Sequence, residues 1–142
     1  MGSGAIIMIA VDSNILVRYA VKDDRSQTET ATRFLRHNQC LLLSTVALET
    51  VWVLSSKKAY ALPRETVVER MRHIAGLPTI TVLEAKALDF ALKCYESGMD
   101  FADALHFAIS NQYAGFATLD KKMWLCAERQ SLAERLVLLP TP

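Results

Sequence analysis

The sequence predicts an α/β fold in which helices flank a mostly parallel central sheet. Short apolar segments alternate with amphipathic ones along the chain, which is the order of strands and helices around a parallel sheet. A content of 51% hydrophobic and 22% charged residues is typical of a globular chain, and 142 residues are expected to form one domain. Right-handed crossovers between parallel strands would place helices on both faces of the sheet.

The first predicted elements are a strand, a short helix and a longer helix. Residues 5–11 form an uncharged, isoleucine-rich run that suits a strand buried on both faces. The preceding Met-Gly-Ser-Gly resembles a cloning remnant and is left out of the fold prediction. A helix at 15–21 follows, which Ser13 or a neighbour can cap. The helix at 26–37 begins with a serine followed three residues later by Glu29, which is the pattern of a capping box.

The middle of the chain predicts a second strand and two further helices. Residues 40–44 suit a short buried strand, and Thr45 can cap the strongly apolar helix at 46–60. Pro63 stands where a first-turn proline starts a helix, and the amphipathic segment 65–75 follows it.

The rest of the chain continues the alternation of strands and helices. The β-branched segment 79–83 predicts a third strand. Helices are expected at 84–97, 101–113 and 122–130, and strands at 116–119 and 136–139.

Charge, apolar run lengths and cysteines limit the partners and the compartment. The net charge is +1, so nucleic acid or anionic lipid would have to be met by local patches. The longest apolar run has seven residues, far fewer than the roughly 20 of a membrane span, so no membrane partner is expected. Cys40, Cys94 and Cys126 are odd in number and far apart, which predicts reduced core residues of a cytoplasmic protein.

Acids in apolar surroundings are the most informative residues. Asp12 ends the first predicted strand and Asp120 ends the fourth, and the carboxyl ends of parallel strands share one edge of a sheet. Glu49 lies about one turn into the helix that leaves the second strand at this edge. Asp103 begins a helix about 16–18 Å long, and the following strand returns over roughly 16 Å, which brings Asp103 level with Asp120. Four carboxylates are therefore expected to converge.

Each acid also has an ordinary explanation. Asp12 could cap the following helix, and Glu49 could pair with a buried arginine. Asp100 and Asp103 could be the cap and the first-turn acid of one helix, and Asp120 could begin a turn. Convergence favours a site, because partly buried like charges disfavour one another's ionised forms and few basic residues lie in these segments. A hard divalent cation, Mg²⁺ or Mn²⁺, would relieve the repulsion and suit hydrolysis of a phosphodiester by metal-activated water.

The chain carries four motifs in order, at 9–16 (IAVDSNIL), 49–54 (ETVWVL), 99–106 (MDFADALH) and 118–120 (TLD). Together they resemble the PIN-domain family and, within it, the VapC-type ribonuclease toxins of toxin–antitoxin pairs. The similarity covers about residues 8–139. It implies a PIN-like three-layer sandwich, a Mg²⁺- or Mn²⁺-dependent endoribonuclease acting on RNA, a homodimer, and inhibition by a cognate antitoxin.

The resemblance also implies site residues and products. The catalytic acids fall on Asp12, Glu49, Asp103 and Asp120. Asp12 and Asp103 would be the principal metal ligands, and the other two would orient or deprotonate water. Asn14 and Thr118 match auxiliary polar positions, while Asp100 would either bind metal through water or only cap its helix. Cleavage would leave 5′-phosphate and 3′-hydroxyl ends.

Other chemistries lack their motifs, since the chain has no G-x-x-x-x-G-K-[ST], no G-x-G-x-x-G and no H-E-x-x-H. Trp52 is expected in the core beside Glu49. His106, one helical turn after Asp103, is expected in the core or in support of the site rather than as a ligand. Lys121 and the lysine after it would form a solvated face or touch RNA phosphates.

A catalytically inactive PIN-fold module is the alternative function. In that case the apolar helices at 46–60 and 65–75 would dock a protein partner. The intact set of acids argues against it.

Overall fold

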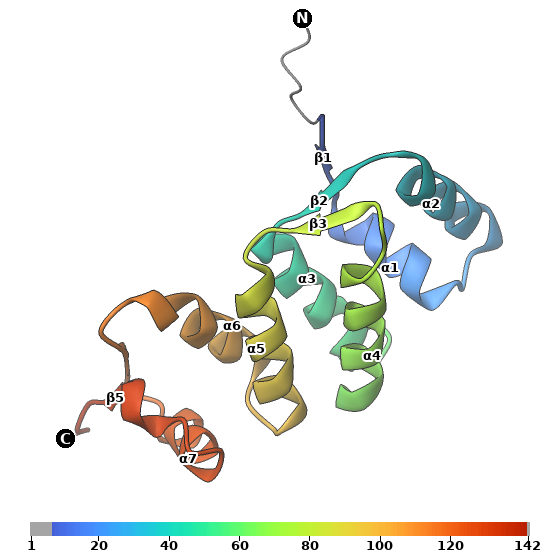
Figure 1. Ribbon diagram of the computed structural model, residues 1–142. Helices are drawn as coiled ribbons and strands as arrows, with labels where there is room; N and C mark the ends of the chain where they lie inside the picture. The colour runs from blue at the N-terminus through green and yellow to red at the C-terminus, as the bar shows by residue number, and fades with distance from the viewer. Residues whose placement is uncertain (1–6, 142) are drawn as a thin grey trace, which may run out of the picture. The chain divides into compact units, whose positions relative to one another are not determined.

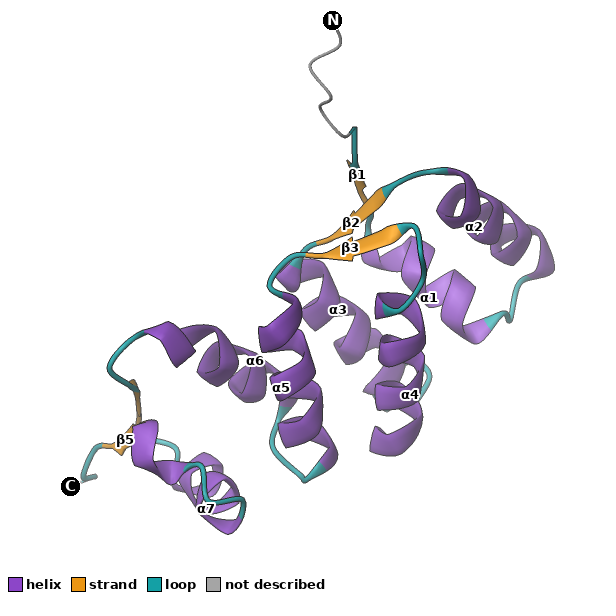
Figure 2. Ribbon diagram, in the orientation of Figure 1, coloured by secondary structure: helices purple, strands orange, loops and turns teal. Residues whose placement is uncertain are grey.

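The chain divides between Leu83 and Glu84 into two compact units. The computed structural model describes residues 7–141, and within them it contains seven α-helices and five strands, with every strand pair parallel. Figure 2 shows the alternation of helices and strands along the chain. The predicted α/β class and the parallel pairing are therefore confirmed.

A three-stranded parallel sheet in the order β1-β2-β3 forms the first unit's sheet. Its strands are β1 (Ile9–Ala10), β2 (Cys40–Leu42) and β3 (Ile80–Val82). Cys40 lies in register with Ile9 on one side and with Ile80 on the other. The prediction that the first strand is buried on both faces was wrong: Ile9 is 43% exposed, because β1 is an edge strand. The first two residues of that predicted strand lie outside the described residues.

Four helices complete the first unit, namely α1 (Ser13–Val21), α2 (Arg25–His37), α3 (Ser44–Ser55) and α4 (Arg64–Ala75). Figure 1 shows α1, α3 and α4 on one side of the three strands, and α2 packs against α1. Leu16, Leu54, Met71 and Ile74 are fully buried between these helices and the sheet. The helix that holds Asp12 at its start is thus anchored in a well-packed core.

The capping box predicted for α2 was wrong. The helix begins one residue earlier, and Asp24 is its cap, accepting a hydrogen bond from the Gln27 backbone N–H at 3.0 Å. Glu29 lies 3.3 Å from Arg25 in an i,i+4 ion pair instead of reaching back to the cap. Asp24 stands in the extended conformation that a cap requires, so its carboxylate takes the position that the serine was expected to fill.

The helix predicted at 46–60 is shorter than expected at its end. It begins without a side-chain cap, so the prediction of Thr45 as cap was wrong, and it ends at Ser55. The Ser55 hydroxyl donates to the Val51 carbonyl at 2.8 Å, and the Ser56 hydroxyl accepts from the Lys58 backbone N–H at 3.3 Å. Serines that bond to the backbone in this way compete with helix formation.

Trp52 was wrongly expected in the core. The buried face of α3 carries Ala47, Val51 and Leu54, which recur at helical spacing. Trp52 falls on the other face and is 65% exposed, and Glu49, one turn earlier, is exposed as well. The charged Glu49 and the exposed Trp52 therefore lie on the same face of α3.

The second unit consists of α5 (Ala85–Glu96), α6 (Phe101–Ile109), η1 (Ser110–Gln112), β4 (Phe116–Thr118), α7 (Lys121–Arg129), η2 (Ala133–Arg135) and β5 (Leu136–Leu138). Helices α5 and α6 pack together, with Phe90 edge-on to Phe107 at 5.9 Å between ring centroids. Strands β4 and β5 pair in parallel. Gly115 leads into β4 so close to β5 that a Cβ atom there would lie 2.7 Å from the Arg135 carbonyl oxygen.

The three cysteines are buried and free, as predicted for core residues. Burial, and to a lesser extent the neighbouring Cys126, raises the pKa of the Cys94 thiol to about 11. Among the described helices, none combines the length and the apolarity that a membrane crossing needs.

Candidate active site

The first unit brings Asp12 and Glu49 to one serine. Asp12 is the N-cap of α1, and its Oδ1 accepts from the Ser13 backbone N–H at 2.7 Å. The Ser13 hydroxyl donates a short hydrogen bond to Oε1 of Glu49 and lies 3.4 Å from Oδ1 of Asp12. Since a hydroxyl has one hydrogen, the Glu49 carboxylate holds it. The two acids from β1–α1 and α3 are therefore neighbours, as the sequence predicted.

Ser13 is a site residue whose role the sequence analysis missed. Its side chain is buried, with 7% of the residue exposed, and it is one of two buried polar or charged residues among those described. The sequence showed only a serine between Asp12 and Asn14, which reads as a cap. Its actual partner lies 36 positions away, so no local pattern could have found it.

Glu49 is not tied to an arginine in the described part of the chain. Arg18, the nearest basic residue to Asp12 in sequence, pairs instead with Asp23 at 3.0 Å and lies 3.4 Å from the Tyr60 hydroxyl. Residues 7–141 thus supply no cation to the Asp12–Glu49 pair, and the ordinary explanation proposed for Glu49 fails.

Asn14, the auxiliary residue of this unit, is exposed and lines a groove of about 440 Å³ between α1 and α2. Ile15 and Phe34 line the same groove. Asn14 therefore neighbours the Asp12 cap along the chain without contributing a hydrogen bond to it.

The second unit gathers Asp100, Asp103 and Asp120. Asp100 caps α6 and accepts from the Asp103 backbone N–H at 3.3 Å. Asp103 is half-buried in the first turn of α6. Burial raises the pKa of the Asp103 carboxyl, the charges of Asp100 and Asp120 raise it further, and His106 opposes the shift. Ionising Asp103 is therefore costly unless a cation is present.

Asp120 is the N-cap of α7 and accepts from the Met123 backbone N–H at 3.1 Å. Thr118 holds the preceding turn, because its hydroxyl accepts from the Asp120 backbone N–H at 3.0 Å. The exposed His106 stacks on Phe116 with 6.3 Å between ring centroids. His106 is thus outside the core, and its charge acts on Asp103 from the same helix.

Three of these acids are helix caps, so the ordinary explanation holds for Asp12 and Asp100, whereas Asp120, which was expected to begin a turn, caps α7 instead. Each uses one carboxylate oxygen for its cap, Oδ1 in Asp12 and Asp120 and Oδ2 in Asp100. In the described structure the second oxygen of each makes no hydrogen bond, which leaves a ligand atom for a hard cation. Capping and metal binding are compatible at these positions.

Within residues 7–141 no three His, Cys, Asp or Glu side chains form one metal-ligating group. The structure shows two sets of acids, each inside its own unit: Asp12 with Glu49, and Asp103 with Asp100 and Asp120. Oxygen-only donors of this kind suit Mg²⁺ or Mn²⁺, which keep several waters and need few protein ligands.

An α/β chain whose carboxylates follow its parallel strands is typical of metal-assisted chemistry on phosphate esters. The family model of the PIN domain matches residues 9–125, and the chain belongs to the PIN domain family. Proteins with this domain are typically metal-dependent nucleases, which implies a nucleic acid substrate. No curated protein matches the chain.

Proposed function

We propose that this chain is a Mg²⁺- or Mn²⁺-dependent endoribonuclease and the toxin of a toxin–antitoxin pair, acting in the cytoplasm as a homodimer. The carrying observation is the Asp12–Glu49 pair, which shares Ser13 and receives no cation from the described chain. Paired carboxylates that remain unneutralised next to a nucleic acid would repel its phosphates, so a divalent cation is required for function.

In this proposal the four acids Asp12, Glu49, Asp103 and Asp120 act in one reaction. Asp12 and Asp103 would hold the ion, each through a carboxylate oxygen that makes no hydrogen bond in the described structure. A bound divalent cation would polarise the phosphate and lower the pKa of a nearby water. Glu49 or Asp120 accepts the proton of the attacking water as its oxygen bonds to phosphorus. The bond from phosphorus to the 3′-oxygen breaks and that oxygen takes a proton from solvent, which leaves 5′-phosphate and 3′-hydroxyl ends.

The remaining polar residues keep these acids in place. Ser13 fixes one Glu49 oxygen, and Thr118 fixes the turn that carries Asp120. Asp100 orients the first turn of α6 and raises the cost of ionising Asp103 in the absence of metal. Asn14 is proposed as an auxiliary residue that contacts the substrate near Asp12.

Asp12→Asn tests the assignment, since it keeps the size of the side chain and removes one charged ligand. We expect loss of Mn²⁺-dependent cleavage of a labelled RNA, with circular dichroism unchanged. Glu128→Gln, which removes one exposed charge from α7, is the matched control. Cleavage at the wild-type rate by pure Asp12→Asn protein would refute the site, and cleavage by no variant, wild type included, would favour the inactive binding module.

A double-mutant cycle tests whether acids of both units serve one ion. Mn²⁺ affinity is measured by calorimetry for Asp12→Asn, Asp103→Asn and the double variant. Ligands of one ion couple strongly, so the second substitution should cost much less than it does alone. Additive losses would show that the two units bind metal independently.

The antitoxin proposal is tested at the same acids. An acidic pocket suits an arginine side chain, whose guanidinium pairs with carboxylates in bidentate geometry. A co-expressed antitoxin should bind the Glu49→Ala, Asp103→Ala double variant more weakly than wild type. Equal binding would place the docking surface elsewhere and leave the nuclease proposal intact.

A further inference from the structure

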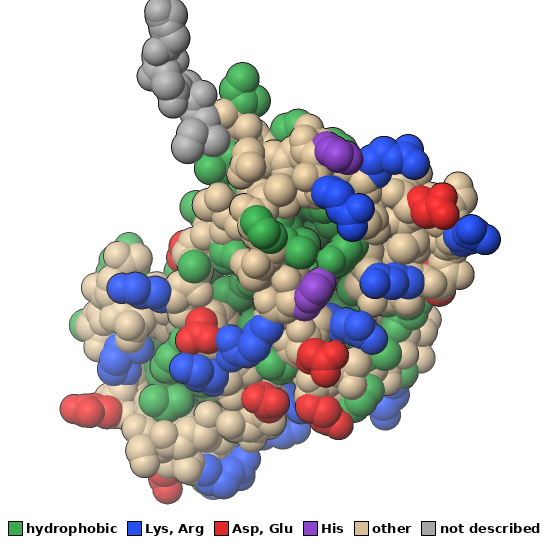
Figure 3. Space-filling view, turned by 45° about the vertical axis from the view of Figure 1, so that its right-hand side comes forward, with side chains coloured by type: hydrophobic (Ala, Val, Ile, Leu, Met, Phe, Trp, Pro, Cys, Tyr) green, Lys and Arg blue, Asp and Glu red, His purple; other side chains and the backbone are tan. Residues whose placement is uncertain are grey.

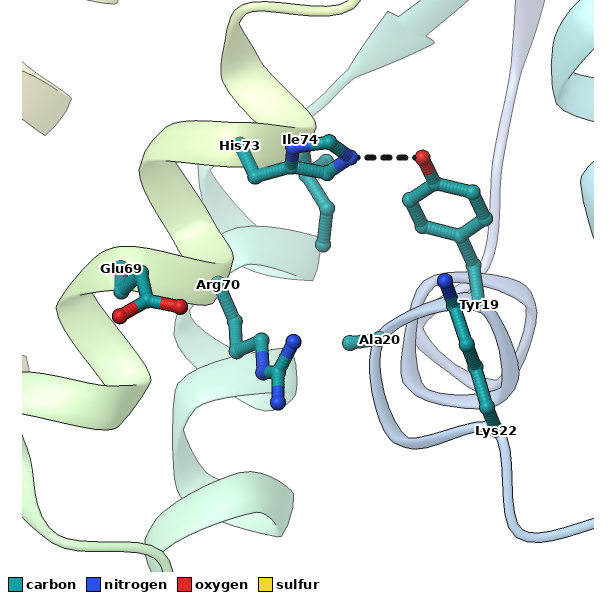
Figure 4. A pocket seen from close by; sticks show the side chains of 7 residues that line it. All are labelled: Tyr19, Ala20, Lys22, Glu69, Arg70, His73 and Ile74. Carbon is teal, nitrogen blue, oxygen red and sulfur yellow. Dashed lines mark hydrogen bonds between the residues drawn. The ribbon is translucent and has the colours of Figure 1, made fainter.

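A pocket between α1 and α4 has no part in the proposed cleavage and is lined by basic residues. It has a volume of about 170 Å³ and is lined by Tyr19, Ala20, Lys22, Glu69, Arg70, His73 and Ile74. Figure 4 shows the Arg70 side chain entering the pocket from α4 and Lys22 standing opposite it at the end of α1. All lining residues belong to the first unit.

Two cations in this pocket lack ionic partners. Neither Lys22 nor Arg70 forms an ion pair within residues 7–141. The ammonium of Lys22 lies 5.7 Å from the centroid of the Tyr19 ring, which leaves its hydrogen-bond donors directed at solvent or a ligand. Arg70 contributes a planar guanidinium, which can bind two oxygens of a phosphate at once.

The pocket is held in place by an aromatic pair. The Tyr19 hydroxyl and Nε2 of His73 are 2.7 Å apart, and the two rings stack with 5.7 Å between centroids. This contact ties α1 to α4 and so holds together the two backbone segments that carry Lys22 and Arg70. A second pocket, which Tyr19 also lines, adds Arg36, and Figure 3 shows Lys, Arg and His side chains around a hollow with a hydrophobic floor on this face.

Charge is distributed unevenly between the two units. Residues 1–83 carry ten Lys and Arg against seven Asp and Glu, whereas residues 84–142 carry six against eight. Since the whole chain has a net charge of only +1, attraction to an RNA strand has to come from local cations. Asp12 and Glu49 repel phosphates, so this attraction is needed at a distance from them.

We propose that Lys22 and Arg70 bind a phosphate of the RNA strand whose cleavage site lies at Asp12. This inference rests on the proposed ribonuclease function. Asp12 and Lys22 are the two caps of α1, and their separation of ten residues sets them about 15 Å apart. Both ends of one rigid helix thus contact the same strand, one at the reacting phosphate and one at a phosphate further along. Glu69 lines the same pocket and weakens the binding of an anion.

The test uses a fluorescein-labelled single-stranded oligoribonucleotide, with binding followed by anisotropy in EDTA and cleavage followed in Mn²⁺. The variant is Lys22→Gln with Arg70→Gln. The matched control is Lys57→Gln with Lys58→Gln, which removes two exposed charges of the same unit outside the pocket. We expect the pocket variant to lose roughly tenfold in affinity and its salt slope to fall by about 0.7, which corresponds to one single-strand phosphate contact. The control should change neither.

Further readouts separate the pocket from the catalytic site. The pocket variant should show a raised KM, a nearly unchanged kcat and an unchanged Mn²⁺ affinity, whereas Glu69→Gln should tighten RNA binding. Equal losses of RNA affinity in the pocket variant and in the control, or no loss in either, would overturn the phosphate-binding proposal. If wild type still cleaves RNA, the proposed nuclease function would stand. If inorganic phosphate stabilises wild type but the pocket variant binds RNA as tightly as wild type does, the pocket would be assigned to a free phosphate compound. That result would overturn the proposal as well. Failure of wild type to bind or cleave RNA would overturn both.

Discussion

Asp103→Asn separates a metal ligand from a structural acid, because the two roles predict opposite effects on the metal-free protein. Asp103 is half-buried, and the pKa of its carboxyl is raised by burial and by the charges of Asp100 and Asp120. Its ionised form therefore destabilises the folded state at neutral pH. Replacing it with asparagine should leave the melting temperature unchanged or raise it.

The size of this effect follows from the two neighbouring carboxylates. A like-charge pair one helical turn apart costs about 0.2–0.5 kcal/mol, and solvent screening keeps the contribution of Asp120 in the same range. Loss of the favourable interaction of Asp103 with the α6 N-terminus offsets part of the gain. The net stabilisation should be less than about 1 kcal/mol, or about 3 °C in melting temperature for a chain of this length.

The dependence on pH has a definite sign. Because the folded pKa of Asp103 lies above its ordinary value of 3.8, the folded state holds the proton more tightly than the unfolded chain. Wild type thus loses stability relative to Asp103→Asn as pH rises from about 4 through the raised pKa. The difference between the two proteins should be near zero at pH 3 and constant at neutral pH.

Added Mn²⁺ should reverse the order of stability. At a concentration 100 times the wild-type Kd, binding stabilises wild type by about 2.7 kcal/mol. A tenfold weaker Kd in the variant reduces this to about 1.4 kcal/mol at the same concentration. Thermal melting at fixed ionic strength, with and without Mn²⁺, measures both effects.

Asp100→Ala is the internal control for capping. Loss of the cap should cost about 1 kcal/mol, and the response to Mn²⁺ should persist if Asp100 only caps α6. If metal-free Asp103→Asn melts well below wild type and keeps the full Mn²⁺ shift, Asp103 is a structural acid and the ligand assignment is refuted.

Three further predictions concern the fold and the carboxylate pair. Since the pKa of Cys94 is raised to about 11, no more than about one in a thousand of its thiols are ionised at pH 8. The Cys94 thiol of the native protein should therefore react with a disulfide reagent only after denaturation. Fast reaction of Cys94 in the folded protein would contradict its burial. Gly115→Ala should destabilise the protein by about 1–3 kcal/mol in urea unfolding, because the added Cβ would lie 2.7 Å from the Arg135 carbonyl oxygen, and unchanged stability would show that the strands adjust freely. Ser13→Ala should weaken Mn²⁺ binding in calorimetry by releasing Glu49, whereas unchanged affinity would limit Ser13 to packing.

The order of strands and helices could be predicted from the sequence because apolar runs and amphipathic periods are local signals. The acids at the ends of β1 and β4 followed from that order together with the polarity of parallel strands. Within the first unit the structure confirms the neighbourhood of Asp12 and Glu49, and within the second that of Asp103 and Asp120. That all four act on one ion remains a prediction.

Three features depended on geometry that local patterns do not encode. Asp24 and Ser26 are both competent caps, and the left-handed backbone of Lys22, with φ 59°, fixes the turn in which Asp24 takes that role. The apolar run around Trp52 has no clear period, so it could not show which face of α3 is buried. Ser13 acquires its role only when α3 packs against α1.

Helix capping and metal binding arise from the same positions in this fold. A carboxylate placed just after a parallel strand also precedes a helix, where one oxygen satisfies a backbone N–H and the other makes no hydrogen bond in the described structure. For this reason the cap at Asp12 or Asp120 counts neither for nor against a catalytic role. Asp103 is different, because it caps nothing, is half-buried and lies beside two other carboxylates. The attraction between its charge and the α6 N-terminus offsets only part of the cost of burial and like-charge repulsion, so the proposed metal site is tested most directly there.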